Sequence, residues 1–202
     1  PDGSGYTVLE PDNESQKQVL VRYEMANGNR TVIDSSLKEE NLKLENISPD
    51  GKRILYYEQG NLHVRDVRSN RTIQITEDGT EDVISNGNAV WSPDGKRIAY
   101  VQRDQSNVRL RPTLVPSDPT YPEVKSVRYA RVGDTIASLR VGIVDATGGN
   151  TRWLSILAPA EGYYLGQVSW AENSDEVLVE KLSRGRDERE FLIADLRTGA
   201  ID

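Results

Sequence analysis

Short runs in which apolar and polar residues alternate recur along the chain, and turn-forming residues separate them. Alternation with a period of two places successive side chains on opposite faces of a strand. The first three runs lie at residues 6–10, 18–24 and 30–33, and Asn27-Gly28-Asn29 predicts a tight hairpin between the last two. Because Val, Ile, Leu, Tyr and Thr dominate the runs, the pattern predicts an all-β protein.

One turn sequence, Ser-Pro-Asp-Gly, occurs intact at residues 48–51 and 92–95, and a shortened copy, Pro-Asp-Gly, opens the chain. Pro presets φ, Asp accepts hydrogen bonds from its own backbone, and Gly adopts the positive φ that returns the chain. The two aspartates are 44 residues apart. This spacing matches one four-stranded blade of a β-propeller, so the sequence predicts a repeat fold.

We therefore expect residues 1–202 to form one domain, a partial β-propeller of about four four-stranded antiparallel blades with the first and last incomplete. The approximate blades are 1–36, 37–78, 79–157 and 158–202. Beyond the first blade, the expected strands are 42–47, 53–58, 61–66, 71–75, 88–91, 97–102, 139–145, 163–170, 176–181 and 190–195, with Trp153 in an outer strand.

The third blade carries an insertion at residues 103–138. Pro112, Pro116, Pro119 and Pro122 exclude a helix there and disfavour a central strand, so we expect an extended excursion away from the blade. Long insertions on a rigid scaffold are often functional.

The incomplete outer blades predict open sheet edges with unpaired backbone groups. We expect the chain either to belong to a longer propeller or to form a homo-oligomer through these edges. It begins inside a turn with no signal segment, which fits a piece of a longer protein or a missing leader.

Composition and charge argue against several kinds of binding partner and site. The formal net charge of −7 argues against nucleic acid as a partner, because binding to phosphates draws on clustered Lys and Arg. No apolar run approaches the roughly 18 residues of a membrane span. The absence of Cys excludes disulfides, thiolate nucleophiles and Cys-ligated metals, but leaves the compartment open.

The chemistry-bearing residues predict no catalytic site, no cofactor and no metal in this chain. His63 is the only imidazole, and it lies between Leu62 and Val64 on an expected strand, so we interpret it as a structural residue. No Gly-x-Ser-x-Gly nucleophile turn is present. The adjacent carboxylates Glu39-Glu40, Glu81-Asp82 and Asp187-Glu188 are interpreted as solvated turn charges, and Gly148-Gly149 as a hairpin turn rather than a phosphate-binding loop.

Trp91 and Trp170 occupy the same position in successive expected blades, directly before the turn. Recurrence at a repeat position predicts that these rings pack between neighbouring sheets. Stacking on a ligand is the alternative.

With these features placed, the chain resembles the N-terminal β-propeller region of dipeptidyl peptidase IV, in the prolyl-oligopeptidase-type serine peptidases. The likeness is carried by Trp91-Ser92-Pro93-Asp94-Gly95-Lys96 with Ile98-Ala99-Tyr100, by Thr76-Glu77-Asp78-Gly79 through Asn86-Gly87, by Tyr121-Pro122 with Tyr129-Ala130-Arg131-Val132-Gly133, and by residues 140–145. It implies a C-terminal hydrolase domain as the partner of this region and favours a periplasmic or extracellular location.

The chain departs from that family at two places. In the family, an Asn-Gly is followed by a helical segment with Asp-Trp-Val-Tyr-Glu-Glu, whose two acids bind the substrate's ammonium group. Here Asn86-Gly87 leads directly into Asn88-Ala89-Val90-Trp91, and the loop at residues 11–17 lacks the family's arginine. No substrate-binding residue therefore transfers to this chain.

The leading hypothesis is a non-catalytic propeller segment that flanks and restricts access to an active site on a separate hydrolase domain. Proteolysis of N-terminal dipeptides is then implied for the full-length protein. The alternatives are a stand-alone β-propeller scaffold for protein interactions and, more remotely, a propeller enzyme that acts on sugars.

Overall fold

The structure, a computed structural model, describes residues 3–11, 18–34, 46–80, 82–115, 120, 122–156, 159 and 162–202. Several sequence-based expectations lie outside these residues: the loop at 12–17, Glu39-Glu40, most of the strand expected at 42–47, Glu81, Pro116, Pro119 and Tyr121.

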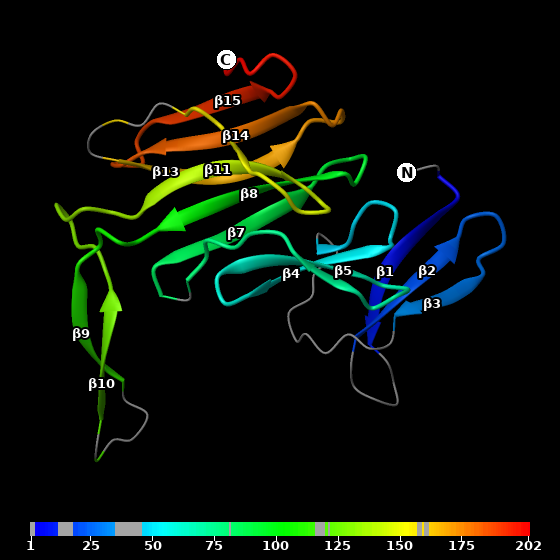
Figure 1. The fold of residues 1–202 in the computed structure, drawn as a ribbon, viewed down its shortest axis with the longest axis horizontal. Coiled ribbons are helices and arrows are strands. Elements are labelled where there is room, and N and C mark those ends of the chain that lie inside the picture. The colour runs from blue at the N-terminus through cyan, green and yellow to red at the C-terminus, as the bar shows by residue number, and fades with distance from the viewer. Residues whose placement is uncertain are drawn as a thin grey trace.

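The described residues form antiparallel sheets that follow one another in a stack, with no α-helix among them (Figure 1). The first sheet contains β1 (Gly5–Pro11), β2 (Gln18–Glu24) and β3 (Arg30–Asp34). The second contains β4 (Arg53–Glu58), β5 (Asn61–Asp66) and β6 (Thr72–Gln74). The third has the order β12-β11-β8-β7, formed by β7 (Ile84–Trp91), β8 (Arg97–Asp104), β11 (Ser138–Asp145) and β12 (Arg152–Trp153). The fourth contains β13 (Tyr163–Trp170), β14 (Glu176–Ser183) and β15 (Arg189–Asp195).

This architecture confirms the prediction of an all-β partial propeller whose sheets do not close into a ring. Among the residues that the structure describes, only those of the third sheet form four strands. In the second sheet, Ile47 forms an isolated bridge with Ile54, at the end of the strand expected at 42–47. In the fourth sheet, Ile201 forms an isolated bridge with Ala194, so a further pairing begins beside β15 in the blade that the sequence predicted to be incomplete.

The insertion contains a two-stranded hairpin, which we call the arm. Its strands are β9 (Leu110–Val115) and β10 (Glu123–Arg128), and it projects away from the stacked sheets (Figure 1). Pro112 lies within β9, opposite Ser126. A proline is tolerated there because both strands of a two-stranded hairpin are edge strands.

The repeated turn is held by the same hydrogen bonds in both copies. The hydroxyl of Ser48 donates to Asp50 Oδ1 (2.7 Å), and Ser92 donates to Asp94 Oδ1 (2.6 Å). Each serine hydroxyl also accepts from the backbone amide five residues later, at 2.9 Å. The glycines that follow the aspartates, at 51 and 95, have φ of 72° and 68°, a region that only glycine enters without strain.

Apolar clusters between successive sheets hold the stack together. Leu20, Ile47 and Ile54 pack between the first and second sheets. A larger cluster around Leu55, Val64, Ile98 and Tyr100 joins the second to the third, and one around Val101, Val141, Val177 and Val179 joins the third to the fourth. Burial of these faces is the main stabilising contribution, because a single two- or three-stranded sheet is marginal in water.

A recurring contact, which we call the Trp–Arg clasp, connects the third sheet to both of its neighbours. The indole Nε1 of Trp91 donates to the backbone oxygen of Asn46 before the second sheet, and Arg53 of that sheet lies over the Trp91 ring and donates to Gly95 O at 2.5 Å. The contact repeats one sheet later. Trp170 donates to Val90 O at 3.1 Å, and Arg97 lies over the Trp170 ring, forms a hydrogen bond with Ser174 O, and pairs with Asp175 at 3.1 Å.

The first two sheets lack this clasp. Gly5 stands where Arg53 and Arg97 stand after their turns, and Ile47 stands where the tryptophans stand before theirs. A Cβ on Gly5 would lie 2.5 Å from the backbone oxygen of Tyr23, so no side chain fits there. Both members of the clasp are therefore missing together, and among the described residues an apolar cluster packs between these sheets.

We predict that W170F lowers the free energy of unfolding by about 1–2 kcal/mol, because it leaves the Val90 carbonyl without its indole donor. Urea unfolding of W170F, R97M and the double variant should give a coupling free energy of at least about 0.5 kcal/mol. The control W153F, in edge strand β12, should cost less than W170F. Strictly additive effects of W170F and R97M would contradict the clasp.

The turns predict a dependence of stability on pH. Partial burial tends to raise the pKa of Asp50 and Asp94, but hydrogen bonds from the serine hydroxyl and a backbone amide outweigh it, so both pKa values lie below the ordinary value. A lowered folded-state pKa contributes stability above about pH 4, and this contribution is lost as the pH falls through the folded-state value.

The double variant D50N/D94N should therefore be less stable than the wild type at pH 7 and should lose less stability on acidification. Urea midpoints measured from pH 7 to about pH 3 test this. Parallel curves for the two proteins would show that the turn carboxylates do not contribute.

Candidate functional site

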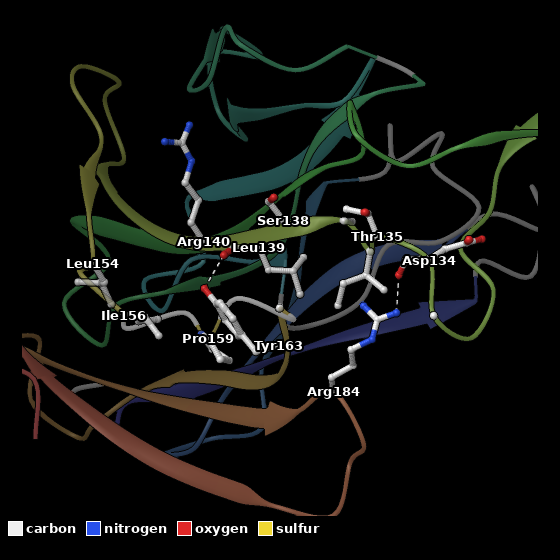
Figure 2. A pocket seen from close by; sticks show the side chains of 14 residues that line it. Asp134, Thr135, Ser138, Leu139, Arg140, Leu154, Ile156, Pro159, Tyr163 and Arg184 are labelled. Carbon is white, nitrogen blue, oxygen red and sulfur yellow. Dashed lines mark hydrogen bonds between the residues drawn. The ribbon is translucent and has the colours of Figure 1, made fainter.

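A cleft of about 550 Å³ opens between the third and fourth sheets at the base of the arm (Figure 2). One wall is the segment that returns from the arm into β11, and the opposite wall carries Tyr163 and Arg184 of the fourth sheet. The lining residues are Gly133, Asp134, Thr135, Ile136, Ala137, Ser138, Leu139, Arg140, Leu154, Ile156, Pro159, Gly162, Tyr163 and Arg184. Apolar walls with a few convergent polar groups are typical of binding clefts.

Tyr163 fixes the inner end of the cleft. It is the first residue of β13, and its hydroxyl donates to the backbone oxygen of Leu139 at 2.5 Å, joining the fourth sheet to the third (Figure 2). Burial raises the pKa of the Tyr163 phenol. The hydroxyl therefore remains protonated at neutral pH and available as a donor.

Asp134 connects the arm to the fourth sheet. Its Oδ2 accepts from Arg111 Nη2 of β9 at 2.6 Å and from the Arg131 amide at 3.0 Å, while its backbone oxygen accepts from Arg184 at the end of β14 (Figure 2). The side chains of Arg111 and Asp134 are only 22% and 25% exposed. One residue thus receives hydrogen bonds from the arm, from the returning segment and from the fourth sheet.

The same contacts determine the ionisation of Asp134. The backbone hydrogen bond from Arg131 and the side-chain hydrogen bond from Arg111 lower the pKa of this carboxyl. A carboxylate that accepts charge-assisted hydrogen bonds is stabilised in its ionised form. Asp134 is therefore negatively charged throughout the physiological range.

His63 lies far from a relay geometry. It is 9% exposed in the middle of β5, opposite Tyr56 and Gln74, and its ring stacks on Tyr56 with centroids 5.2 Å apart. Its Nδ1 has no hydrogen-bond partner among the described residues. The imidazole is therefore packed as a core side chain and is not oriented by a carboxylate, as a general base in a serine hydrolase would be.

The other candidate residues from the sequence lie in turns between strands. Asp187 and Glu188 lie exposed in the β14–β15 turn, where Asp187 accepts from Ser183 Oγ at 2.7 Å. Asp82 is exposed as well. Gly148 and Gly149, with φ of 85° and 118°, form the turn between β11 and β12. In the part of the chain that the structure describes, no group of three His, Asp or Glu side chains could hold a metal ion.

Where the resemblance implies an acidic helix, the structure has a β-bulge. Strand β7 runs without interruption from Ile84 to Trp91, and its register against β8 shifts between Gly87 and Val90. Asn88, in the bulge, has a φ of 47°. The chain therefore passes this position as a strand.

Sequence reasoning assigned no role to Tyr163 or Asp134. Asp134 follows Gly133 in a segment interpreted only as part of the excursion, and its arginine partners lie 23 and 50 residues away. The one available signal was the concentration of arginines along the insertion, at positions 109, 111, 128 and 131. Asp134 follows Arg131 closely in the sequence, and an Asp near several Arg residues is a candidate for a paired charge.

We predict that D134N loosens the arm. Hydrogen exchange at residues 110–115 and 123–128 should become severalfold faster, because an amide cannot replace the charge-assisted bond from Arg111. The control D187N removes an exposed carboxylate that does not contact the arm, and should leave exchange in the arm unchanged. Equal exchange in D134N and the wild type would show that Asp134 does not hold the arm.

No described helix has the length and apolar character that a membrane crossing requires. Curated proteins that this chain is similar to are named dipeptidyl-aminopeptidases. It is 25% identical to a protein named probable dipeptidyl-aminopeptidase B from Pyrenophora teres f. teres, in an alignment that covers 83% of this chain and 22% of that protein. A protein with the same name from Sordaria macrospora is also 25% identical, with 80% and 20% covered. The chain thus spans about a fifth of the length of the curated relatives it matches.

Solved structures share the fold. Dipeptidyl peptidase 4 of Porphyromonas gingivalis matches with a TM-score of 0.71 at 18% identity, covering 98% of this chain and 30% of that chain. A putative dipeptidyl aminopeptidase IV from Bacteroides ovatus matches with a TM-score of 0.68 at 20% identity, covering 97% and 27%. The family model for the dipeptidyl peptidase IV (DPP IV) N-terminal region matches residues 12–202. This chain, with its stacked antiparallel sheets and its arm, belongs to the family of DPP IV N-terminal regions.

Proposed function

We propose that this chain is a non-catalytic β-propeller segment of a dipeptidyl-peptidase-IV-like serine peptidase. In this role it flanks an active site on a separate hydrolase domain and restricts access to it. The observation that carries the proposal is the position of His63, because the only imidazole of the chain is packed inside a sheet and takes part in no nucleophile relay. Serine peptidase chemistry then has to come from another part of the protein.

The comparisons support the proposal that catalysis belongs to a different part of the protein from this chain. The matched relatives named dipeptidyl-aminopeptidase are about five times as long as the aligned region, which leaves room for a hydrolase domain outside it. We propose release of N-terminal dipeptides as the activity of the full-length protein. Because the bulge at Asn88 stands where the family carries its acidic helix, the proposal includes an altered grip on the substrate's N-terminus.

The geometry supports a restricting role through rigidity. The Trp–Arg clasps fix the second, third and fourth sheets to one another, and Asp134 fixes the arm to the fourth. A wall of such sheets excludes large substrates by shape while short or unfolded peptides pass. Binding surfaces of this kind select by size without contributing a reacting group.

The first test compares the purified 202-residue chain with the full-length protein on a chromogenic X-Pro dipeptide reporter. We expect release by the full-length protein and none by the chain alone. Turnover by the chain, retained after removal of contaminating peptidases by a second purification step, would refute the non-catalytic assignment. Absence of turnover by the full-length protein on X-Pro and X-Ala reporters would refute the peptidase assignment.

The second test addresses access. In the full-length protein, R97M should loosen the clasp between the third and fourth sheets and raise severalfold the cleavage of a long X-Pro polypeptide relative to the short reporter. The control K125Q changes an exposed arm residue and should leave the ratio unchanged. If R97M changed both rates in proportion, the propeller segment would not act as a size filter.

A further inference from the structure

A row of polar side chains crosses the third sheet on the face opposite the cleft. Asn86 of β7, Gln102 of β8 and Arg140 of β11 are direct cross-strand neighbours. They lie on the face toward the second sheet, together with Tyr100. Arg140 is also one of the residues that line the cleft, but Figure 2 shows its side chain extending to the other side of β11 from Tyr163 and Arg184.

The guanidinium of Arg140 is held in one orientation. The Cζ atom of Arg140 lies 3.6 Å from the centre of the Trp153 ring, and its Nε donates to Gln102 Oε1 at 2.7 Å. The stack fixes the plane of the guanidinium, and the hydrogen bond fixes its rotation within that plane. Such an arrangement removes most of the side-chain entropy that an arginine otherwise loses when it binds a ligand.

The residue that orients Arg140 is itself buried and fixed. Gln102 is 2% exposed, and its Nε2 donates to Asn86 Oδ1 at 2.9 Å and to Asp78 Oδ2 at 2.6 Å. These two acceptors force the amide oxygen of Gln102 toward Arg140. Asn86, also 2% exposed, is fixed in turn by donating to Asp78 Oδ1 at 3.0 Å and to Gly60 O at 3.2 Å.

The terminal nitrogens of Arg140 remain available. Among the described residues, Nη1 has no hydrogen-bond partner and Nη2 lies 3.9 Å from Asp78 Oδ2, too far for a hydrogen bond. The side chain is 50% exposed. An arginine whose role was to pair with a carboxylate would approach it directly, as Arg111 approaches Asp134 at 2.6 Å.

We propose that Arg140 is a carboxylate-binding residue on the propeller surface. The edge formed by Nη1 and Nη2 matches the two oxygens of a carboxylate, which it would bind through two parallel hydrogen bonds. Both oxygens of Asp78 already accept from buried amides, so its charge is partly compensated, but its proximity keeps the affinity for anions low. The ligand class is the carboxylate of a peptide, from an acidic side chain or from a C-terminus. This site goes beyond the proposed function and does not depend on it.

The test is a titration of the ¹⁵N-labelled 202-residue chain with sodium acetate at constant ionic strength, balanced with chloride. The Nε–H signal of Arg140, assigned with R140K, should shift saturably with half-saturation at about 10 mM. R103Q is the matched control, because Arg103 is exposed on the same sheet but on the opposite face. It should leave the titration unchanged.

A readout from Trp153 makes the variant R140K informative. In the otherwise unchanged chain, acetate should also shift the indole N–H signal of Trp153, and R140K, which keeps the charge but lacks the planar guanidinium, should weaken the binding measured from this signal about tenfold. A blocked peptide with one Glu, its Gln counterpart, and an unblocked peptide with a free C-terminus distinguish the source of the carboxylate. A linear response of Arg140, or equal binding by R140K and the wild type, would overturn the proposal.

Discussion

The contact on which the rest of the structure depends is the indole N–H of one sheet bound to a backbone carbonyl of the sheet before it. An arginine from the earlier sheet covers the same ring and bonds the turn beyond it. Each clasp therefore connects two sheets at three points, and it fixes their relative position where apolar packing alone permits sliding. Sheets with only a few strands need this, because each buries too little surface to be stable by itself.

The cleft and the arm follow from that fixed arrangement. Tyr163 reaches Leu139 O because the clasp of Trp170 with Val90 sets the fourth sheet against the third. Asp134 then anchors the insertion by accepting hydrogen bonds from the hairpin and from Arg184, next to the end of β14 in the fourth sheet. A two-stranded arm with exposed side chains such as Leu114 and Val124 requires such an anchor at its base.

The two faces of the third sheet are specialised in different ways. The face toward the fourth sheet is apolar and leads into the cleft, whereas the face toward the second carries the amides of Asn86 and Gln102 and ends at Arg140. Buried amides in a fully bonded row are rigid, because each unmade hydrogen bond would cost free energy in a low-dielectric interior. The row thus holds the half-exposed guanidinium of Arg140 in place through hydrogen bonds that begin in the core.

The sequence by itself determined what is local or periodic. The hydrogen bonds of the Ser-Pro-Asp-Gly turn span five residues or fewer, and apolar and polar side chains alternate along the strands with a period of two. The recurrence of Trp91 and Trp170 predicted packing between sheets. Tertiary structure alone decided the partners of Asp134, the bulge at Asn88 and the row that ends at Arg140. These features depend on contacts between residues of different strands and loops, whose geometry no local pattern encodes, since it arises only after the apolar faces have packed.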